Sequence, residues 1–208
     1  MTEDEAKAIL SARVSRETFT RLELYAGLLI KWQKTINLVS PATLPQLWAR
    51  HMLDSAQVID HAPQDAKTWL DLGSGGGFPG LVCAAIAAES HPGLKIDLVE
   101  ADLRKAAFLR ETARQMGLSV GVFSRRIEDL PPQSADVISA RALAPLVTLC
   151  GYAHRHLSDT GVALFQKGAR HAEELETARQ GWQMDVTVIP SVTDAEAVLF
   201  RIEDLTDV

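Results

Sequence analysis

A glycine-rich run between two apolar segments places the strongest limit on how this chain folds. It extends from Asp71 to Gly80, after the apolar Thr68–Leu70 and before the apolar, alanine-rich Leu81–Ala87. Glycine permits positive φ and close approach of a ligand to the backbone, and the first N–H groups of a helix lack partners within that helix. The run therefore predicts a strand, a loop and a helix that together bind a nucleotide-like cofactor.

Two kinds of ligand fit the spacing of this loop. Gly75, Gly77 and Gly80 match G-x-G-x-x-G, which places a pyrophosphate at a helix N-terminus. The run from Asp71 to Gly77 also fits D-x-G-x-G-x-G through Gly73, and a carboxylate at the loop entrance repels a pyrophosphate but attracts a cation. S-adenosylmethionine (SAM) carries a sulfonium and an α-ammonium and no phosphate, so Asp71 favours SAM.

A second acid, Glu100, ends the next predicted strand, residues 95–99. A carboxylate at this place accepts hydrogen bonds from ribose hydroxyls, and NAD enzymes have it too. Glu100 therefore indicates an adenosine cofactor and is compatible with both SAM and NAD. Only Asp71 favours SAM over NAD.

The composition of the chain indicates one globular domain with a small extension. Of its 208 residues, 47% are hydrophobic and 23% are charged. No apolar stretch has the length of a membrane span and the N-terminus is acidic, so we expect a cytoplasmic protein with no membrane partner. Cys83 and Cys150 lie far apart without metal-ligand spacing, which predicts buried free thiols and no metal site.

The net charge of the chain argues against a protein that binds nucleic acid over its whole surface. The formal net charge is −6. Between Ala101 and Arg126, however, six basic residues stand against two acidic ones. Such a cluster can contact phosphates, although the charge pattern alone favours a solvated helix face.

The chain divides into two regions of different texture. Residues 1–66 predict a helical extension, with a capping box at Thr2 and Glu5 and a break that ends at Pro41. Residues 67–208 alternate short apolar strands with amphipathic helices. The expected strands are 68–72, 95–99, 120–123, 135–139, 161–166, 184–189 and 197–202, and the expected helices are 79–90, 103–116, 145–157 and 170–180.

This alternation predicts an α/β fold in which helices cover both faces of a mostly parallel, seven-stranded sheet. The connection between the last two strands, Pro190–Glu196, is too short for a parallel crossover and implies an antiparallel hairpin. A seven-stranded sheet with one reversed strand is the Rossmann-like class I arrangement of SAM-dependent methyltransferases.

Ligands in such a sheet bind beyond the carboxyl ends of the strands. Ile127 and Glu128 follow the third strand, where they suit the face and the edge of an adenine. Arg141 follows the fourth. It is either a surface arginine with a packed stem or part of the functional edge.

With these residues in place, the chain resembles the glucose-inhibited division protein B family, bacterial methyltransferases that modify guanine N7 in 16S ribosomal RNA. The resemblance spans nearly the whole chain. Its segments are Asn37-Leu38, Arg50–Ser55 (R-H-x-x-D-S), Asp71–Gly80, Arg126–Glu128, Ser139–Ala142 and Lys167-Gly168. Two departures are Ala101, where many relatives have serine, and Ala140, which interrupts a Ser-Arg-Ala.

The resemblance implies a role for each matching residue. Those implied to contact the cofactor are Gly73, Phe78, Ile127, Glu128 and Arg141. Those implied to face RNA are Arg126, Lys167 and the pair Arg50 and His51. The implied partner is 16S ribosomal RNA or the small ribosomal subunit, and we expect the protein to act as a monomer.

The expected chemistry requires positioning and no proton transfer. Guanine N7 carries a free lone pair at neutral pH, so its methylation needs no general base. Alignment of N7, methyl carbon and sulfur is then the main task, and we expect Arg126 and Arg141 to orient the guanine or its phosphate. Two alternatives stay open at this point: an NAD-dependent oxidoreductase and a noncatalytic RNA-binding or ribosome-assembly protein.

Overall fold

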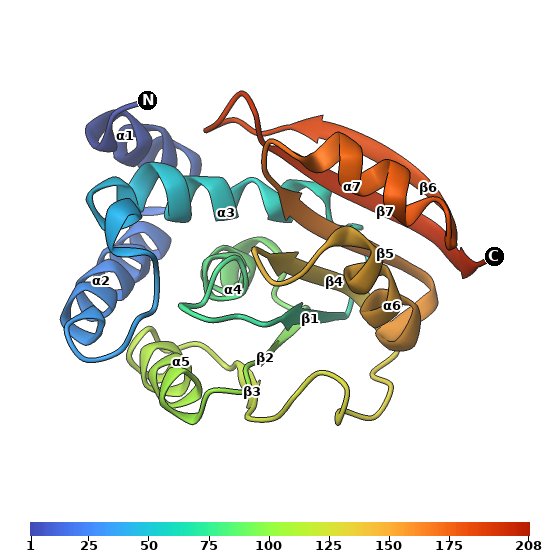
Figure 1. Ribbon diagram of the computed structural model, residues 1–208. Coiled ribbons are helices and arrows are strands. Elements are labelled where there is room, and N and C mark those ends of the chain that lie inside the picture. The colour runs from blue at the N-terminus through green and yellow to red at the C-terminus, as the bar shows by residue number, and fades with distance from the viewer.

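A single seven-stranded sheet forms the centre of the computed structural model, which describes residues 1–208 (Figure 1). The strands are β1 (Thr68–Leu72), β2 (Lys95–Val99), β3 (Gly121–Phe123), β4 (Ala135–Arg141), β5 (Leu157–Lys167), β6 (Trp182–Pro190) and β7 (Val198–Asp207). Their order is β3-β2-β1-β4-β5-β7-β6. Strand β7 is the reversed strand: it pairs antiparallel with both β5 and β6, and all other pairings are parallel. The predicted fold class and the antiparallel hairpin are confirmed.

Helices cover both faces of the sheet, as predicted. The first face carries α4 (Gly80–Ser90) and α5 (Leu103–Gln115), and the second carries α6 (Leu146–His156) and α7 (His171–Ala178). Because side chains alternate along a strand, Trp69 joins the core of the first face and Leu70 that of the second.

Some predicted boundaries were wrong: β7 continues to Asp207, five residues beyond its expected end, and β4 and β5 also differ. Strand β4 continues to Arg141, two residues beyond the expected end, and β5 begins at Leu157, directly after α6. In β5, the first residues, Leu157–Thr160, are only partly buried or exposed, so they lack the continuous apolar pattern from which a strand is predicted.

The N-terminal region is helical, as expected. Helix α1 (Glu3–Arg13) starts with the predicted capping box at Thr2, and α2 (Arg16–Gln33) follows. The next part, here called the 41–61 segment, is a series of short turns. They are η1 (Pro41–Gln46, 3-10), η2 (Trp48–Leu53, π-helical), α3 (Asp54–Ala56) and η3 (Val58–His61, 3-10).

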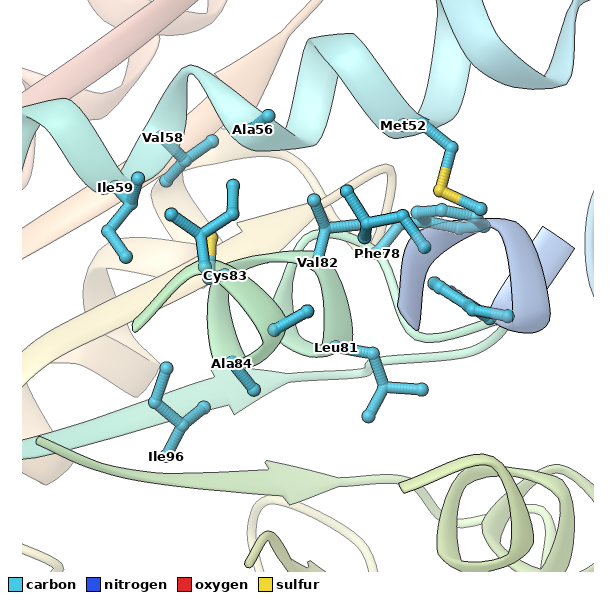
Figure 2. Packing of buried hydrophobic residues seen from close by; sticks show 14 of the residues in the cluster. Met52, Ala56, Val58, Ile59, Phe78, Leu81, Val82, Cys83, Ala84 and Ile96 are labelled. Atoms are coloured by element: carbon cyan, nitrogen blue, oxygen red, sulfur yellow. The ribbon is translucent and has the colours of Figure 1, made fainter. Parts of the chain in front are cut away.

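The 41–61 segment packs on helix α4. Figure 2 shows Met52, Ala56 and Ile59 above Val82 and Cys83 of α4. All five belong to one buried cluster that also contains residues of α1 and α2. The N-terminal region thus shares its core with the sheet, and a division of the chain at residue 66 stays a prediction.

Candidate active site

A cleft of about 1150 Å³ opens at the carboxyl ends of the parallel strands. It lies where the strand order reverses, between β1 and β4, which is the usual ligand site of such sheets. All of the residues predicted to bind cofactor or RNA line it, except Asp71 and Gly77. Those that do are Arg50, His51, Gly73, Gly75, Phe78, Glu100, Arg126, Ile127, Glu128, Arg141 and Lys167.

The glycine loop is packed from behind by the N-terminal region. A Cβ at Gly77, where φ is +97°, would lie 2.6 Å from the Tyr25 hydroxyl, and a Cβ at Gly76 would lie 2.9 Å from the Leu38 carbonyl oxygen. The Tyr25 hydroxyl donates to the Gly76 carbonyl. Gly77 therefore serves the packing behind the loop, while Gly73 and Gly75 remain partly exposed toward the cleft.

Glu100 holds the edge of this loop. Its Oε2 accepts from the Gly75 N–H at 2.8 Å and its Oε1 accepts from the Asp102 N–H at 2.8 Å. Each carboxylate oxygen keeps a further lone pair. Because Glu100 lines the cleft, its carboxylate fits a ligand with two neighbouring hydroxyls, such as a ribose.

Asp71 lies beneath the glycine loop, outside the cleft. It is fully buried, its Oδ1 accepts from the Ser139 hydroxyl at 2.6 Å, and its Oδ2 has no hydrogen-bond partner. Burial raises the pKa of this carboxyl to about 6, against the opposing effect of the Ser139 hydrogen bond. Contrary to expectation, its carboxylate does not stand at the loop entrance but supports the loop from below.

Asp71→Asn is expected to reduce the pH dependence of stability. A pKa raised from 3.8 to about 6 in the folded state means that the native protein binds this proton more tightly than the unfolded chain. Stability is then fully present below the unfolded pKa and is lost as the pH rises through this window. Between pH 4 and pH 7, the difference in unfolding free energy between variant and wild type should therefore shift by about 2 kcal/mol in favour of the variant.

Urea unfolding of both proteins at those two pH values measures this difference. Asparagine keeps the acceptor for Ser139 and cannot ionise. An identical pH dependence in the two proteins would show that the Asp71 carboxyl is not perturbed.

One end of the cleft suits an adenine. Ile127 and Glu128 line it as predicted, and Tyr152 of α6 joins them, its hydroxyl donating to Glu128 Oε1 at 2.5 Å. This hydrogen bond is the main cause of a lowered pKa for the Glu128 carboxyl. Sequence reasoning missed Tyr152, because a tyrosine on an amphipathic helix carries no signal of its contacts with a loop 24 residues away.

Arg141 lies at the centre of the cleft and is tied to the 41–61 segment. Its Nη1 donates to the Arg50 carbonyl at 2.8 Å and lies 3.5 Å from Asp54 Oδ2, while its Nη2 donates to His51 Nδ1 at 2.6 Å. The guanidinium stands 5.0 Å from the centre of the Phe78 ring, a cation–π arrangement. Its side chain is only 16% exposed, so Arg141 is not a surface arginine.

His51 is neutral in this arrangement. Burial, together with the charges of Arg141 and Arg50, lowers the pKa of its imidazole to about 3. Since the Arg141 guanidinium only donates, His51 Nδ1 must accept, and Nε2 carries the proton toward Thr43 Oγ1 at 2.9 Å. His51 therefore orients its neighbours and provides no positive charge.

The four residues expected to face RNA divide into two pairs. His51 turns inward, and Lys167 Nζ pairs with Glu174 at 2.5 Å and donates to the Ala144 carbonyl, with 9% of its side chain exposed. Arg126 and Arg50 are exposed, and Arg50 makes only a distant ion pair with Asp194 at 3.9 Å. Both His51 and Lys167 line the cleft but are held by partners within the protein, so their contact with RNA stays a prediction.

The basic cluster between residues 101 and 126 also divides. Arg104, Arg110 and Arg114 on α5 have partners within the protein. Four other cations line the cleft and take part in no ion pair. They are Lys105, Arg125, Arg126 and, after β5, Arg170. Four free cations at the rim of a cleft in an acidic protein suit an anionic ligand.

Three further expectations concern the cysteines, a metal site and a membrane span. Cys83 and Cys150 are buried free thiols, as predicted. No group of three or more His, Cys, Asp or Glu side chains is arranged to hold a metal ion. None of the helices is both long and apolar enough to span a membrane.

Topology and site together define a methyltransferase of the Rossmann-like class I fold. Two solved structures share it: Pyrococcus horikoshii TYW2 in complex with MeSAdo (TM-score 0.58, 16% identity, 81% of this chain and 64% of that one) and a SAM-dependent methyltransferase from Aquifex aeolicus (TM-score 0.57, 14% identity, 86% and 97%). At these identities the likeness concerns the fold alone.

Sequence comparison defines the family. The GidB family model, described as rRNA small subunit methyltransferase G, matches residues 18–199. Ribosomal RNA small subunit methyltransferase G of Jannaschia sp. strain CCS1 is 57% identical over 97% of this chain and 95% of its own length, and that of Cereibacter sphaeroides strain ATCC 17025 is 50% identical over the full length of both. The chain belongs to the rRNA small subunit methyltransferase G family, which confirms the resemblance.

Proposed function

We propose that this protein transfers a methyl group from SAM to N7 of a guanine in the 16S ribosomal RNA of the small subunit. One cleft holds both the glycine loop with Glu100 and the exposed or half-buried cations Lys105, Arg125 and Arg126, which take part in no ion pair, and this combination carries the proposal. Membership of the rRNA small subunit methyltransferase G family supports the same substrate.

The residues around the glycine loop fit SAM. The Glu100 carboxylate would accept hydrogen bonds from the ribose hydroxyls, Ile127 would pack on the adenine, and Glu128, held by the Tyr152 hydroxyl, would meet the polar edge of the adenine. Gly75 is partly exposed with no side chain close to its Cα, which would leave room for the methionine end beside the loop, whereas the space at Gly73 is filled by the Leu143 side chain. When bound, SAM supplies an activated methyl group next to a positively charged sulfur.

The titratable groups of the cleft support a reaction without a general base. The His51 ring is neutral with both nitrogens engaged, and the Asp71 carboxyl is buried outside the cleft. Guanine N7 needs no deprotonation, so these residues only have to hold the base in line with the methyl group. The Phe78 ring has the His51 ring and the Arg141 guanidinium each 5.0 Å from its centre, and this buried cluster would support such alignment.

An oxidoreductase is not favoured. Such an enzyme would need a Tyr-x-x-x-Lys pair or a similar acid near the nicotinamide. Here the tyrosine of the cleft, Tyr152, donates to Glu128 and is followed at the fourth position by His156. A noncatalytic assembly protein would lack methyl transfer, and the experiment below separates it from the enzyme.

Labelled methyl transfer from SAM to small ribosomal subunits that lack this modification tests the proposal, with the product nucleoside identified by mass spectrometry. We expect label in 7-methylguanosine. Tight SAM binding without transfer would indicate a different acceptor, and no SAM binding would refute the cofactor. Free 16S RNA in a parallel reaction shows whether the substrate is RNA or the assembled particle. A ribosomal substrate would place the protein in the cytoplasm, and we propose that it acts as a monomer.

A further inference from the structure

Asp54 joins four segments at the part of the cleft lined by Arg141, Gln166 and Thr193, here called the acceptor side. Its Oδ2 accepts from Gln166 at the end of β5 at 2.6 Å and lies 3.5 Å from Arg141 Nη1 at the end of β4. Its Oδ1 accepts from the Ser191 and Thr193 hydroxyls at 3.2 and 3.1 Å. The side chain of Asp54 is only 16% exposed, so these contacts replace water almost entirely.

The partner of Asp54 on the far side is the loop between β6 and β7, here called the 191–197 loop. In Figure 1 it reaches back over the N-terminal part of the molecule. Besides Asp54, it is held by Gln57, whose Oε1 accepts from the Val192 N–H at 3.1 Å. Thr193, Asp194 and Ala197 of this loop line the cleft.

We propose that Asp54 is a positioning residue that fixes the 191–197 loop and Arg141 as one wall of the RNA-acceptor side of the cleft. The proposal rests on the function given above. A carboxylate is suited to this place because its two oxygens accept from the amides of Gln166 and Gln57 and from two hydroxyls while also pairing with a guanidinium. An asparagine would turn one of these acceptors into a donor.

The cofactor end is separate from this network. Glu100, Ile127 and Glu128 make no hydrogen bond with Asp54 or with the 191–197 loop. Loss of Asp54 should therefore affect the acceptor more than SAM. This split distinguishes a positioning role from a general loss of structure.

The test compares Asp54→Ala and Asp54→Asn with wild type in SAM affinity by calorimetry and in kcat/KM for small subunits. Hydrogen bonds to a charged group contribute about 1.5–3 kcal/mol, so we expect kcat/KM to fall about 10- to 100-fold in Asp54→Ala and less in Asp54→Asn, with the SAM dissociation constant within about threefold. Asp60→Asn is the matched control: Asp60 lies on the same segment outside the cleft, 53% exposed, and pairs with Arg13.

A second measurement needs no catalysis. Amide hydrogen exchange of the 191–197 loop should quicken in Asp54→Ala and remain as in wild type in Asp60→Asn. If Asp54→Ala fails to fold, the double variant Ser191→Ala/Thr193→Val removes only the two hydroxyl groups that bind Asp54 and should give the same split. Unchanged loop exchange, or equal losses of SAM affinity and RNA methylation, would overturn the proposal; inactivity of the wild type would instead count against the proposed function.

Discussion

Arg141→Ala is expected to lower kcat/KM for methylation of small subunits about 100-fold or more. The substitution removes the cation above Phe78, leaves the Asp54 carboxylate without its cationic partner and leaves His51 Nδ1 without its donor. Truncating one partner of a buried, hydrogen-bonded charge pair costs about 2–5 kcal/mol, much of it because the remaining charge is left unpaired. Steady-state kinetics with small subunits as substrate measure the loss.

The His51 imidazole reports on the same change independently of activity. Its pKa of about 3 results first from burial and then from the charges of Arg141 and Arg50. In Arg141→Ala, the pKa should rise toward its ordinary value without reaching it, since burial remains, and NMR titration of the ring follows this. Arg141→Lys keeps the charge but loses the planar fork, so it should keep the low pKa and recover activity only in part. Activity of Arg141→Ala within about threefold of wild type would contradict the role, because the loss of even one charged hydrogen bond exceeds that.

Much of the fold follows from local signals in the sequence. The strands that carry the glycine loop and Glu100 have the predicted bounds, because each is a short, largely apolar run that ends directly before Gly73 or Glu100. The ends of these apolar runs also identify the carboxyl edge of the sheet, at which the site lies. This is why most of the predicted site residues line one cleft.

What sequence could not give is which of these residues are already engaged. The sequence shows Lys167 and Arg141 only as two cationic residues. In the structure, Lys167 is paired with Glu174, and Arg141 is held by a segment about 90 residues earlier. Asp71 precedes the loop in sequence but lies beneath it in space. Arg141 pairs with His51 and Asp71 with Ser139 across 90 and 68 residues, and such pairings depend on how the layers pack, which no periodicity along the chain encodes.

The exposed cations at the rim lead to a second large effect, on RNA binding. Replacing Arg125 and Arg126 with alanine is expected to weaken binding of small subunits about 10- to 100-fold and to reduce the slope of log K against log salt by about 2. Both side chains are exposed at the cleft without an ion-pair partner, so each is free to meet a phosphate. Titrations at several salt concentrations measure the affinity and the slope.

A matched double variant separates local contacts from net charge. Arg16→Ala/Lys34→Ala removes two exposed cations at the ends of α2, away from the cleft, and changes the net charge by the same amount. It should leave the salt slope nearly unchanged, whereas SAM affinity should hold in both variants because Glu100 and the glycine loop are untouched. Equal losses in the two variants would mean that RNA senses only the overall charge of the protein. A loss confined to Arg125 and Arg126 would mean that phosphate contacts at this rim bring the guanine to the cleft.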